Sequence, residues 1–316
     1  MKPIEVLTQM LELVAALAAA PLFLGWVNQC RAWLQNRRAP SLWLPYRNIR
    51  KLFHKDAVIA ESASPLFRLA PYMVFGAMVL AAGIIPSMGT RLPFTVAADA
   101  IALVGLLAMA RVFMSLAAMD IGTAFGTLGA RREMMVGFLA EPALLMVIFV
   151  ASLISATTAL PAIAENLATQ TPGLYPSLAF TAIAFTLVLL AENARIPIDN
   201  PATHLELTMI HEAMVLEYSA RHLALMEWAA ALKLFNYACI GFALFIPWGV
   251  STGEDGPAAL LASIPLLAVK LTVAGGALAF IETISAKLRV FRAPEFLATA
   301  FLFAVLGLLV HLLLGA

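Results

Sequence analysis

The segment AENARIPIDNPATHLELTMIHEAMVLEYSARHLALMEWAAALK, residues 191–233, decides how the rest of the sequence is organised. It places a dense group of ionisable side chains between two long apolar segments. The group comprises Glu192, Arg195, Asp199, His204, Glu206, His211, Glu212, Glu217, Arg221, His222, Glu227 and Lys233. Charged groups beside or inside a lipid bilayer are costly, so their concentration here indicates a functional site.

The composition of the whole chain is that of a helical membrane protein. Its 316 residues are 62% hydrophobic and 12% charged, whereas soluble domains have about half apolar and about a quarter charged residues. Apolar runs of about 18 or more residues recur, as is typical of transmembrane helices. The net charge of +1 does not suggest a nucleic-acid partner. We therefore expect a single all-α integral membrane domain over residues 1–316.

Hydropathy predicts eight transmembrane helices, with Pro and Gly at several of their ends. The expected spans are Val6–Val27, Leu66–Pro86, Val96–Met119, Met135–Ala156, Leu178–Ala191, Leu223–Trp248, Ala258–Ile281 and Pro294–Leu314. The N-terminus has no basic n-region or small-residue cleavage site, so the first span is expected to be retained. Cys30 and Cys239 form neither a disulfide framework nor a metal-ligand pattern.

The distribution of Lys and Arg predicts the orientation in the membrane. Basic residues concentrate after the first, third, fifth and seventh spans, at Arg31 to Lys55, Arg131, Arg132, Arg195, Arg221, Lys287, Arg289 and Arg292. The opposite loops have little beyond Lys2 and Arg91, and one carries Glu254 and Asp255. Both termini are therefore expected outside, with the 192–222 loop in the cytoplasm. The polar stretch from Asp120 to Glu133 is expected to be a loop on the cytoplasmic side.

A basic, aromatic segment at residues 30–65 follows the first span. From Tyr46 onward, apolar Ile49, Leu52 and Phe53 alternate with basic residues, which predicts a short amphipathic helix in the membrane interface. The function of this helix stays open: an anchor in the lipid headgroups, a docking surface for a peripheral protein, or the rim of a ligand entrance. The candidate docking residues are Arg37, Arg38, Arg47, Arg50, Arg131 and Arg132.

Several ionisable residues lie inside or at the ends of the predicted spans, mostly in the cytoplasmic half. They are Arg111, Glu141, Glu192, Glu227, Lys233 and Lys270. Such residues usually face a bundle interior or a wet cavity and pair with one another. Desolvation favours the protonated form of a carboxylate, so a chain of these acids with Lys partners can relay protons. The alternative is a set of structural ion pairs that join helices.

The 192–222 loop has its own predicted structure. Pro197 and Pro201 bias the residues before them toward extended conformations. Asp199 or Asn200 can cap a helix predicted over Pro201–Tyr218. Glu206 and Glu217 would share one face of that helix because they are about three turns apart, and His204 and His211 would share another. The His211-Glu212 pair lacks the second histidine of a zinc-protease motif, and no phosphate-binding or nucleophile-elbow motif is present.

Several motifs together resemble the H-subunit (subunit 1) family of respiratory complex I. They are Glu192-Asn-Ala-Arg-Ile-Pro-Ile-Asp-Asn-Pro, Glu206-Leu, Glu217-Tyr-Ser, Glu227-Trp, Asn36-Arg-Arg-Ala-Pro, Arg68-Leu-Ala-Pro, Ala130-Arg-Arg-Glu and Ala140-Glu-Pro. The resemblance covers nearly the whole chain. Asn200-Pro-Ala-Thr-His-Leu-Glu-Leu-Thr-Met-Ile-His-Glu looks more like the membrane subunits of hydrogenase-4 and formate hydrogenlyase-type complexes.

The chain departs from the complex I pattern in the same loop. It has Ile198 in place of Phe, Pro201-Ala-Thr-His in place of an acid-rich run, and extra residues between Glu206 and Glu217. Two acids at the quinone chamber entrance of complex I are thus missing or moved. This difference leaves quinone binding open and favours the hydrogenase-type branch.

The resemblance implies an energy-coupling subunit of a bacterial or archaeal cytoplasmic-membrane complex, with no cofactor in this chain. Its expected partners are an iron–sulfur small subunit and a hydrogenase-like large subunit on the cytoplasmic side, antiporter-like membrane subunits, and the bilayer. The iron–sulfur clusters, and a [NiFe] centre where the large subunit holds one, would belong to those partners. The implied relay residues are Glu141, Glu192, Glu206, Glu212, Glu217, Glu227, Lys233 and Lys270, and the implied coupling-loop residues are Arg195, Asp199, His204 and His211.

Two other functions remain open at this stage. A stand-alone proton-coupled transporter would also need acids inside the membrane, although many transporters show an internal repeat that this sequence lacks. A purely structural anchor would use the same acids for assembly alone.

Overall fold

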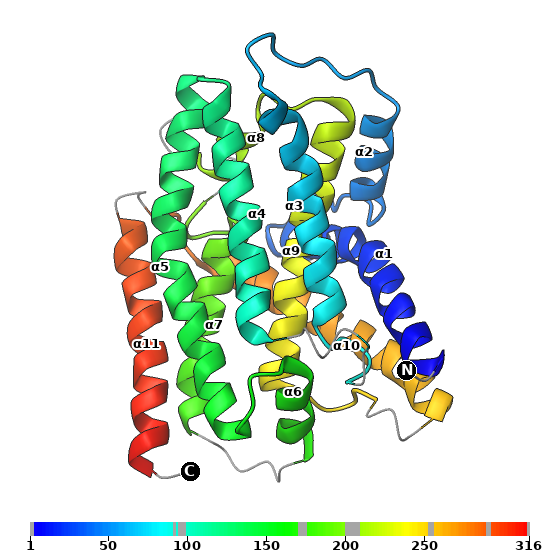
Figure 1. Cartoon of the computed structure of the whole chain (residues 1–316), viewed down its shortest axis with the longest axis vertical. Helices are drawn as coiled ribbons and strands as arrows, with labels where there is room; N and C mark the ends of the chain where they lie inside the picture. Colours follow the sequence, from blue (N-terminus) through cyan, green and yellow to red (C-terminus); the bar gives the residue numbers. More distant parts are fainter. Residues whose placement is uncertain are drawn as a thin grey trace.

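The described part of the chain folds as a bundle of helices, as a computed structural model shows (Figure 1). The structure describes residues 3–90, 93, 99–169, 176–199, 209–251, 256–288 and 292–314, with backbone alone at 3–5, 7 and 256–259. These residues form eleven helices, joined by turns and loops, and no sheet. They are α1 (Pro3–Leu34), α2 (Leu44–Phe53), α3 (Pro65–Ile84), α4 (Ala100–Asp120), α5 (Ala124–Ser155), α6 (Leu160–Thr169), α7 (Pro176–Glu192), α8 (His211–Val215), α9 (Ala220–Phe245), α10 (Gly256–Ile284) and α11 (Ala293–Leu314).

Seven of these helices are long and apolar enough to cross a membrane. They are α1, α3, α4, α5, α9, α10 and α11. Helix α7 is also apolar but has 17 residues, a length of about 25 Å at 1.5 Å per residue. Each predicted span therefore corresponds to one helix of the structure, although α7 falls short of the length of the other seven.

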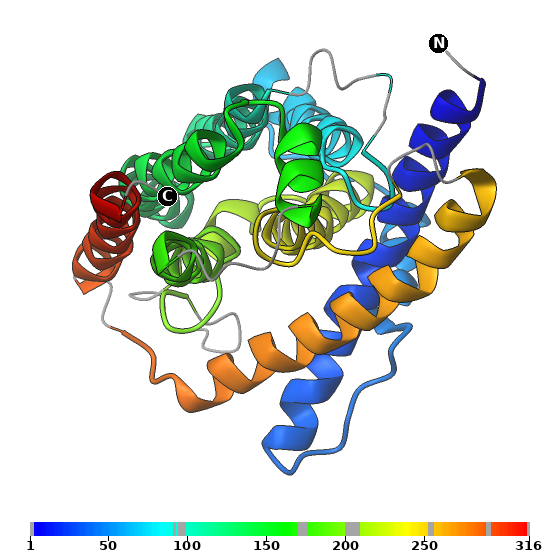
Figure 2. The same cartoon turned by 90° about the horizontal axis from the view of Figure 1, so that it is seen from below.

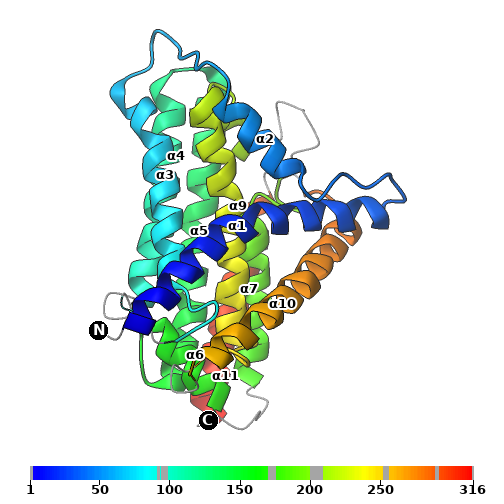
Figure 3. The same cartoon turned by 90° about the vertical axis from the view of Figure 1, so that its right-hand side faces the viewer.

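The upright bundle consists of α3, α4, α5, α7, α9 and α11, while α1 and α10 lean across its side (Figures 1 and 2). Helix α4 packs against α3 and α5, α11 against α5 and α7, and α1 against α10 and α9. Figure 3 shows that α1 bends along its length. Pro21 lies inside this helix and removes a backbone hydrogen bond there, which is a common cause of a kink.

The two ends of the bundle carry different short helices. Helices α2 and α8 lie at one end, and α6 lies at the other, where both chain termini are also found (Figures 1 and 3). We call these the α2 end and the α6 end. Helix α2 is the amphipathic helix that the sequence predicts: Ile49 is buried, and Arg47 and Arg50 are exposed.

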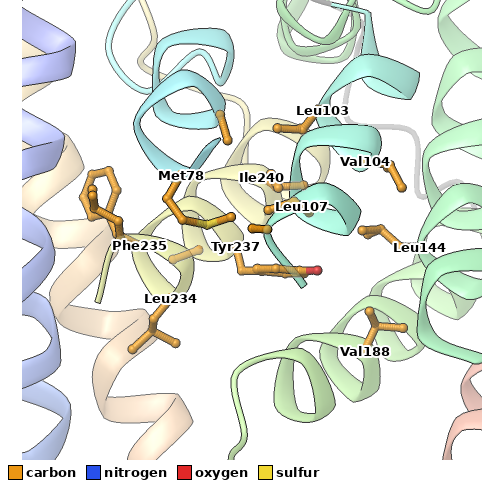
Figure 4. Close-up of a cluster of buried hydrophobic side chains, with 14 of the residues drawn as sticks. Met78, Leu103, Val104, Leu107, Leu144, Val188, Leu234, Phe235, Tyr237 and Ile240 are labelled. Atoms are coloured by element: carbon orange, nitrogen blue, oxygen red, sulfur yellow. The ribbon is translucent and has the colours of Figure 1, made fainter. Parts of the chain in front are cut away.

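The part of the bundle interior around Tyr237 is apolar and closely packed. Figure 4 shows side chains from α3, α4, α5, α7 and α9 meeting around Tyr237, which is 1% exposed. Alanines that are fully buried, such as Ala70, Ala81 and Ala140, occur along the contacting helices. Small residues let membrane helices approach closely, so that van der Waals packing supplies the association energy.

Two loop predictions need correction. The stretch from Asp120 to Glu133 is not a loop, because α5 already begins at Ala124, where the Thr123 side chain accepts a hydrogen bond from the Gly126 N–H. Its charged residues lie on a helix that continues beyond the apolar stretch. The short outer helix α6 was not predicted.

The prediction of a helix over Pro201–Tyr218 is also wrong for residues 209–218, which the structure describes. Residues 201–208 lie outside the described residues, and α8 covers His211–Val215 only. The Tyr218 N–H donates a hydrogen bond to the Val215 carbonyl at 3.0 Å, which forms a turn. The chain turns there to begin α9 at Ala220, so a longer helix cannot form.

Candidate functional site

A cluster of five ionisable side chains lies buried among four helices. Arg111 on α4 pairs with Glu141 on α5 and with Glu192 at the end of α7, and its Nε lies 3.5 Å from Oε1 of Glu133 on α5. The other carboxylate oxygen of Glu192 lies 3.0 Å from Nζ of Lys233 on α9. We call these five residues the Arg111 cluster. It joins helices that are far apart in the sequence.

The charges of the Arg111 cluster do not balance. Three carboxylates face two cations, which leaves one negative charge in excess when every group is ionised. The side chains of Arg111, Glu133 and Glu192 are 5%, 7% and 1% exposed, so water screens this part of the cluster little. An unbalanced charge in a low dielectric is costly. The cluster can therefore lower its energy by binding one proton.

One face of α5 shapes this cluster. Glu133, Gly137 and Glu141 follow one another at intervals of four residues and so lie along one side of the helix. A methyl group added at Gly137 would lie 2.7 Å from Cδ of Arg111. The missing side chain at Gly137 leaves the space that the arginine occupies between the two glutamates.

Glu141 extends the cluster to the side of the bundle. Its side chain is 34% exposed, in contrast with the other two acids. Phe138 and Leu145, one turn to either side, are 80% and 40% exposed. The cluster is thus accessible from an apolar face of α5.

A cavity of about 480 Å³ lies near the α2 end, between α1, α2, α8 and α9. Its volume falls within the range of small-molecule sites. The ionisable residues that line it are His211, Glu212, Tyr218 and Glu227. Tyr218 is held in place because its ring stacks on Phe67 at 4.0 Å and its hydroxyl donates to the Phe67 carbonyl at 3.0 Å.

A second, much smaller cavity lies between this space and the Arg111 cluster. It measures about 20 Å³ and is lined by Arg111 and Lys233 among others. His211, Met226 and Ala230 line both cavities. A space of this size holds about one water molecule. The shared residues therefore separate the large cavity from the buried charges by a single layer of side chains.

His211 lies at this boundary in a neutral form. Burial lowers its pKa to about 4, and nearby Lys233 lowers it further while Asp199 opposes the shift. Asp199 also fixes the backbone, because its Oδ2 accepts hydrogen bonds from the N–H groups of Ile210 at 3.2 Å and His211 at 3.1 Å. A neutral imidazole has one donor and one acceptor nitrogen and can pass a proton between two neighbours.

A second buried cluster lies on the other side of the loop after α7. Glu282 on α10 has a fully buried side chain and pairs with Arg195 at 3.2 Å and with Arg31 on α1 at 3.4 Å. Burial lowers the pKa of Arg195, and Glu282 opposes that shift. We call these three residues the Glu282 cluster. Because Glu192 and Arg195 are three residues apart, the short segment between them joins the two clusters.

The structure brings together some of the predicted relay residues. Glu141, Glu192 and Lys233 belong to the Arg111 cluster, and Glu212 and Glu227 line the large cavity. Others lie elsewhere. Glu217 is exposed outside the cavity lining, and Lys270 donates to the carbonyls of Ile246 and Trp248, both at 2.6 Å. His204 and Glu206 lie outside the described residues.

The predicted docking residues are mostly free at the surface. Arg37, Arg38, Arg47, Arg50 and Arg131 are exposed. Arg132 differs, because its Nη1 donates to the Met209 carbonyl at 2.8 Å and so ties α5 to the segment before α8.

Sequence reasoning missed four residues of the two clusters. Arg111 was noted in its span but not assigned to the site, and Glu133, Glu282 and Arg31 were not assigned either. Glu282 directly follows the predicted seventh span, so an acid at that edge was the available signal. Within the described residues, no group of three or more His, Cys, Asp or Glu side chains is arranged to hold a metal ion.

These features define a multi-pass helical membrane protein with a buried charge cluster beside a cavity at one end. The sequence matches the family described as NADH dehydrogenase over residues 7–313, and the chain belongs to that family, as a relative of subunit 1.

Two relatives from Escherichia coli (strain K12) refine this placement. Hydrogenase-4 component C is 36% identical over 262 residues, which cover 82% of this chain and 81% of that protein. Formate hydrogenlyase subunit 4 is 32% identical over 308 residues, which cover 96% and 97%. A chain of the membrane-bound sulfane sulfur reductase, an archaeal respiratory membrane complex, has the same fold, with a TM-score of 0.81, 21% identity, and coverage of 95% of this chain and 97% of that one.

Proposed function

We propose that this chain is the membrane-anchoring and energy-coupling subunit of a complex I-like, group 4 [NiFe]-hydrogenase-type respiratory complex. In this role it links redox chemistry in a cytoplasmic arm to the movement of protons or sodium ions by other membrane subunits. It contributes no redox cofactor of its own. The family membership and the two hydrogenase-related relatives support this assignment.

The observation that carries the proposal is the continuous series of groups from the cavity to the side of the bundle. The large cavity reaches His211, the small cavity reaches Arg111 and Lys233, and the cluster ends at half-exposed Glu141. The histidine and the carboxylates along this series can bind or release protons, while Arg111 keeps its positive charge. A proton that enters at the α2 end thus has a route toward α5.

The arrangement of the chain supports eight membrane crossings with both termini outside. Both termini lie at the α6 end (Figure 1), which requires an even number of crossings. The seven long helices and the shorter α7 together supply that number. The α2 end carries Arg47, Arg50 and Arg131 at its surface and is therefore assigned to the cytoplasm.

The exposed arginines of the α2 end are the proposed docking surface for the peripheral arm. The iron–sulfur small subunit and the hydrogenase-like large subunit would cover the large cavity there. Electron transfer close to His211 and Glu212 would change the local field, and the segment from Arg195 to Asp199 would respond. This segment would have two conformations. A change of redox state shifts the equilibrium between them only if it stabilises one conformation more than the other.

The proposed outlet is the face of α5 around Glu141. Phe138 and Leu145 make this face apolar, as the contact surface of a neighbouring membrane subunit would be. An antiporter-like partner seated there would receive the protonation signal of the Arg111 cluster through Glu141.

The test uses membrane vesicles that contain the whole complex. Glu141→Gln removes the charge at the outlet and keeps the shape. We expect ion movement per turnover to fall about 100-fold while electron transfer stays nearly unchanged, as for loss of one positioned proton-transfer group. The matched control is Glu295→Gln, at an exposed acid in the first turn of α11, which should leave both rates unchanged.

The same experiment separates the alternatives. Unchanged coupling in Glu141→Gln, with normal assembly, would support a purely structural anchor. A stand-alone transporter would be purified without iron–sulfur proteins and would move ions without electron transfer. Either result would overturn the proposal.

A further inference from the structure

An apolar groove of about 260 Å³ lies between α7, α9 and α10, and none of the residues of the two charge clusters lines it. It exists because α10 leans away from the upright bundle and packs mainly on α1 (Figure 2). The lining residues come from four helices and include Phe23, Ala182, Gly241, Phe245 and Ala274.

The lining of this groove suits a hydrocarbon chain. The lining has two polar side chains, Thr186 and Tyr237, and neither hydroxyl is directed into the groove. The Thr186 hydroxyl donates to the Ala182 carbonyl at 2.8 Å. The Tyr237 hydroxyl points toward Leu144 and Val188 (Figure 4), neither of which lines the groove. A polar ligand would find no partner there.

The depth of the groove matches one leaflet of a bilayer. On α9 its lining runs from Leu234 to Ile246, twelve residues or about 18 Å along the axis. Half of a hydrocarbon core of about 30 Å is about 15 Å. The groove therefore extends from the middle of the membrane to the α6 end of α9.

A cation lies at the outer end of the groove. Lys270 Nζ is 5.8 Å from the ring centroid of Phe242 and donates to the carbonyl of Ile246, and both of those residues line the groove. The ammonium group has three N–H donors. The carbonyls of Ile246 and Trp248 take two of them, both at 2.6 Å, so one donor remains. Among the ion pairs of the described residues, none involves Lys270. Its positive charge is therefore complementary to a phosphate.

We propose that this groove binds one acyl chain of a phospholipid, with the lipid phosphate at Lys270. With the orientation proposed above, the lipid belongs to the outer leaflet, but occupancy of the groove does not depend on the coupling function. The lipid fills the space between α10 and the bundle and so supports the helix that carries Glu282.

A helix of a partner subunit fits the groove less well. Helices dock closely in membranes over exposed small residues. Gly241, the smallest lining residue, is already covered, because a methyl group there would lie 2.9 Å from Cε1 of Phe185. The groove is also lined by three bulky side chains, Phe23, Phe242 and Phe245. Bulky side chains keep a docking helix at a distance.

The experiment measures phospholipid retained by the complex after purification in mild detergent, by native mass spectrometry. Ala274→Phe fills the groove from α10, and Ala182→Phe fills it from α7. Both should lose the phospholipid that the wild type keeps. The control Ala277→Phe adds the same bulk to an exposed position of α10, outside the groove lining, and should keep it.

Lys270→Gln tests the headgroup contact. Delipidated wild type should melt at a higher temperature after addition of phosphatidylglycerol, and it should bind this lipid in preference to phosphatidylcholine. Lys270→Gln should lower that preference by up to about fivefold, as for loss of one exposed charge pair of about 1 kcal/mol.

Three results would overturn the proposal. One is equal phospholipid retention in the groove-filling variants and the wild type. Another is loss of a protein subunit from those variants without loss of lipid, which would identify a partner helix as the occupant. The third result needs no variant: the melting temperature of the delipidated wild type would not change when phosphatidylglycerol is added.

Discussion

The Arg111 cluster and the Glu282 cluster both lie between helices, but the first has an excess of carboxylates and the second has an excess of arginines. In the first, three carboxylates share Arg111 and Lys233. In the second, one carboxylate has two arginines. The first borders a small cavity that leads to His211, whereas Glu282 lines none of the described cavities.

This difference separates a cluster that can change its charge from one that cannot. An excess of carboxylates favours uptake of a proton, and an excess of arginines holds a carboxylate ionised. We therefore interpret the Arg111 cluster as the site that changes its charge and the Glu282 cluster as a group of ion pairs that keeps its charge.

The largest expected effect comes from removal of the central cation. Arg111→Met leaves three buried carboxylates with Lys233 alone, and loss of one partner from a buried ion pair costs about 3–5 kcal/mol. Yield and apparent melting temperature should fall steeply. Arg31→Met is the matched change in the other cluster and should cost about 1 kcal/mol or less, because the Arg31 side chain is 24% exposed and Arg195 remains. Equal losses in the two variants would contradict the comparison.

An intermediate effect is expected at Gly137. Gly137→Ala places a methyl group 2.7 Å from Cδ of Arg111, and overpacking of this kind costs about 1–3 kcal/mol. Glycine Gly105 on α4 has open space around it, so Gly105→Ala should be neutral or slightly stabilising. Thermal unfolding of both variants checks this, and a harmless Gly137→Ala would show that Arg111 does not need that space.

The sequence alone predicted the parts of this site that leave a local signal. Glu141 and Lys233 stand out because they are charged residues in apolar segments. Helix α7 was predicted as Leu178–Ala191 and runs from Pro176 to Glu192, since apolar length and flanking prolines mark such helices well.

The pairing of these charges had no local signal. Arg111 and Glu192 are 81 positions apart, and Arg31 and Glu282 are 251 apart. Their contact depends on which helices are neighbours in space. Glu133 was placed in a loop because it follows two arginines, although it begins the face of α5 that holds Arg111.

The smallest expected effect is a pH dependence at His211. Its pKa is lowered to about 4 in the folded protein, below about 6.5 in an unfolded chain. The unfolded state therefore binds more protons between these values, and stability should fall as the pH drops from about 6.5 toward 4. His211 contributes at most about 1.4 kcal/mol per pH unit.

His211→Gln should flatten this dependence of the apparent melting temperature on pH. The matched control is His54→Gln, at an exposed histidine after α2, which should keep the wild-type slope. An identical slope in His211→Gln and the wild type would show that His211 is accessible to protons in the folded protein.

The central claim is that the Arg111 cluster holds an exchangeable proton and that the Glu282 cluster does not. Glu192 lies between Arg111 and Lys233, and the Glu133 side chain is 7% exposed with Arg111 at 3.5 Å, so the proton is assigned to Glu133. Infrared difference spectroscopy of the complex detects the carbonyl band of a protonated carboxylic acid directly. We expect the band in the wild type and in Glu282→Gln, and its loss in the double variant Glu133→Gln/Glu141→Gln. A band that survives in the double variant, or disappears in Glu282→Gln, would contradict the account.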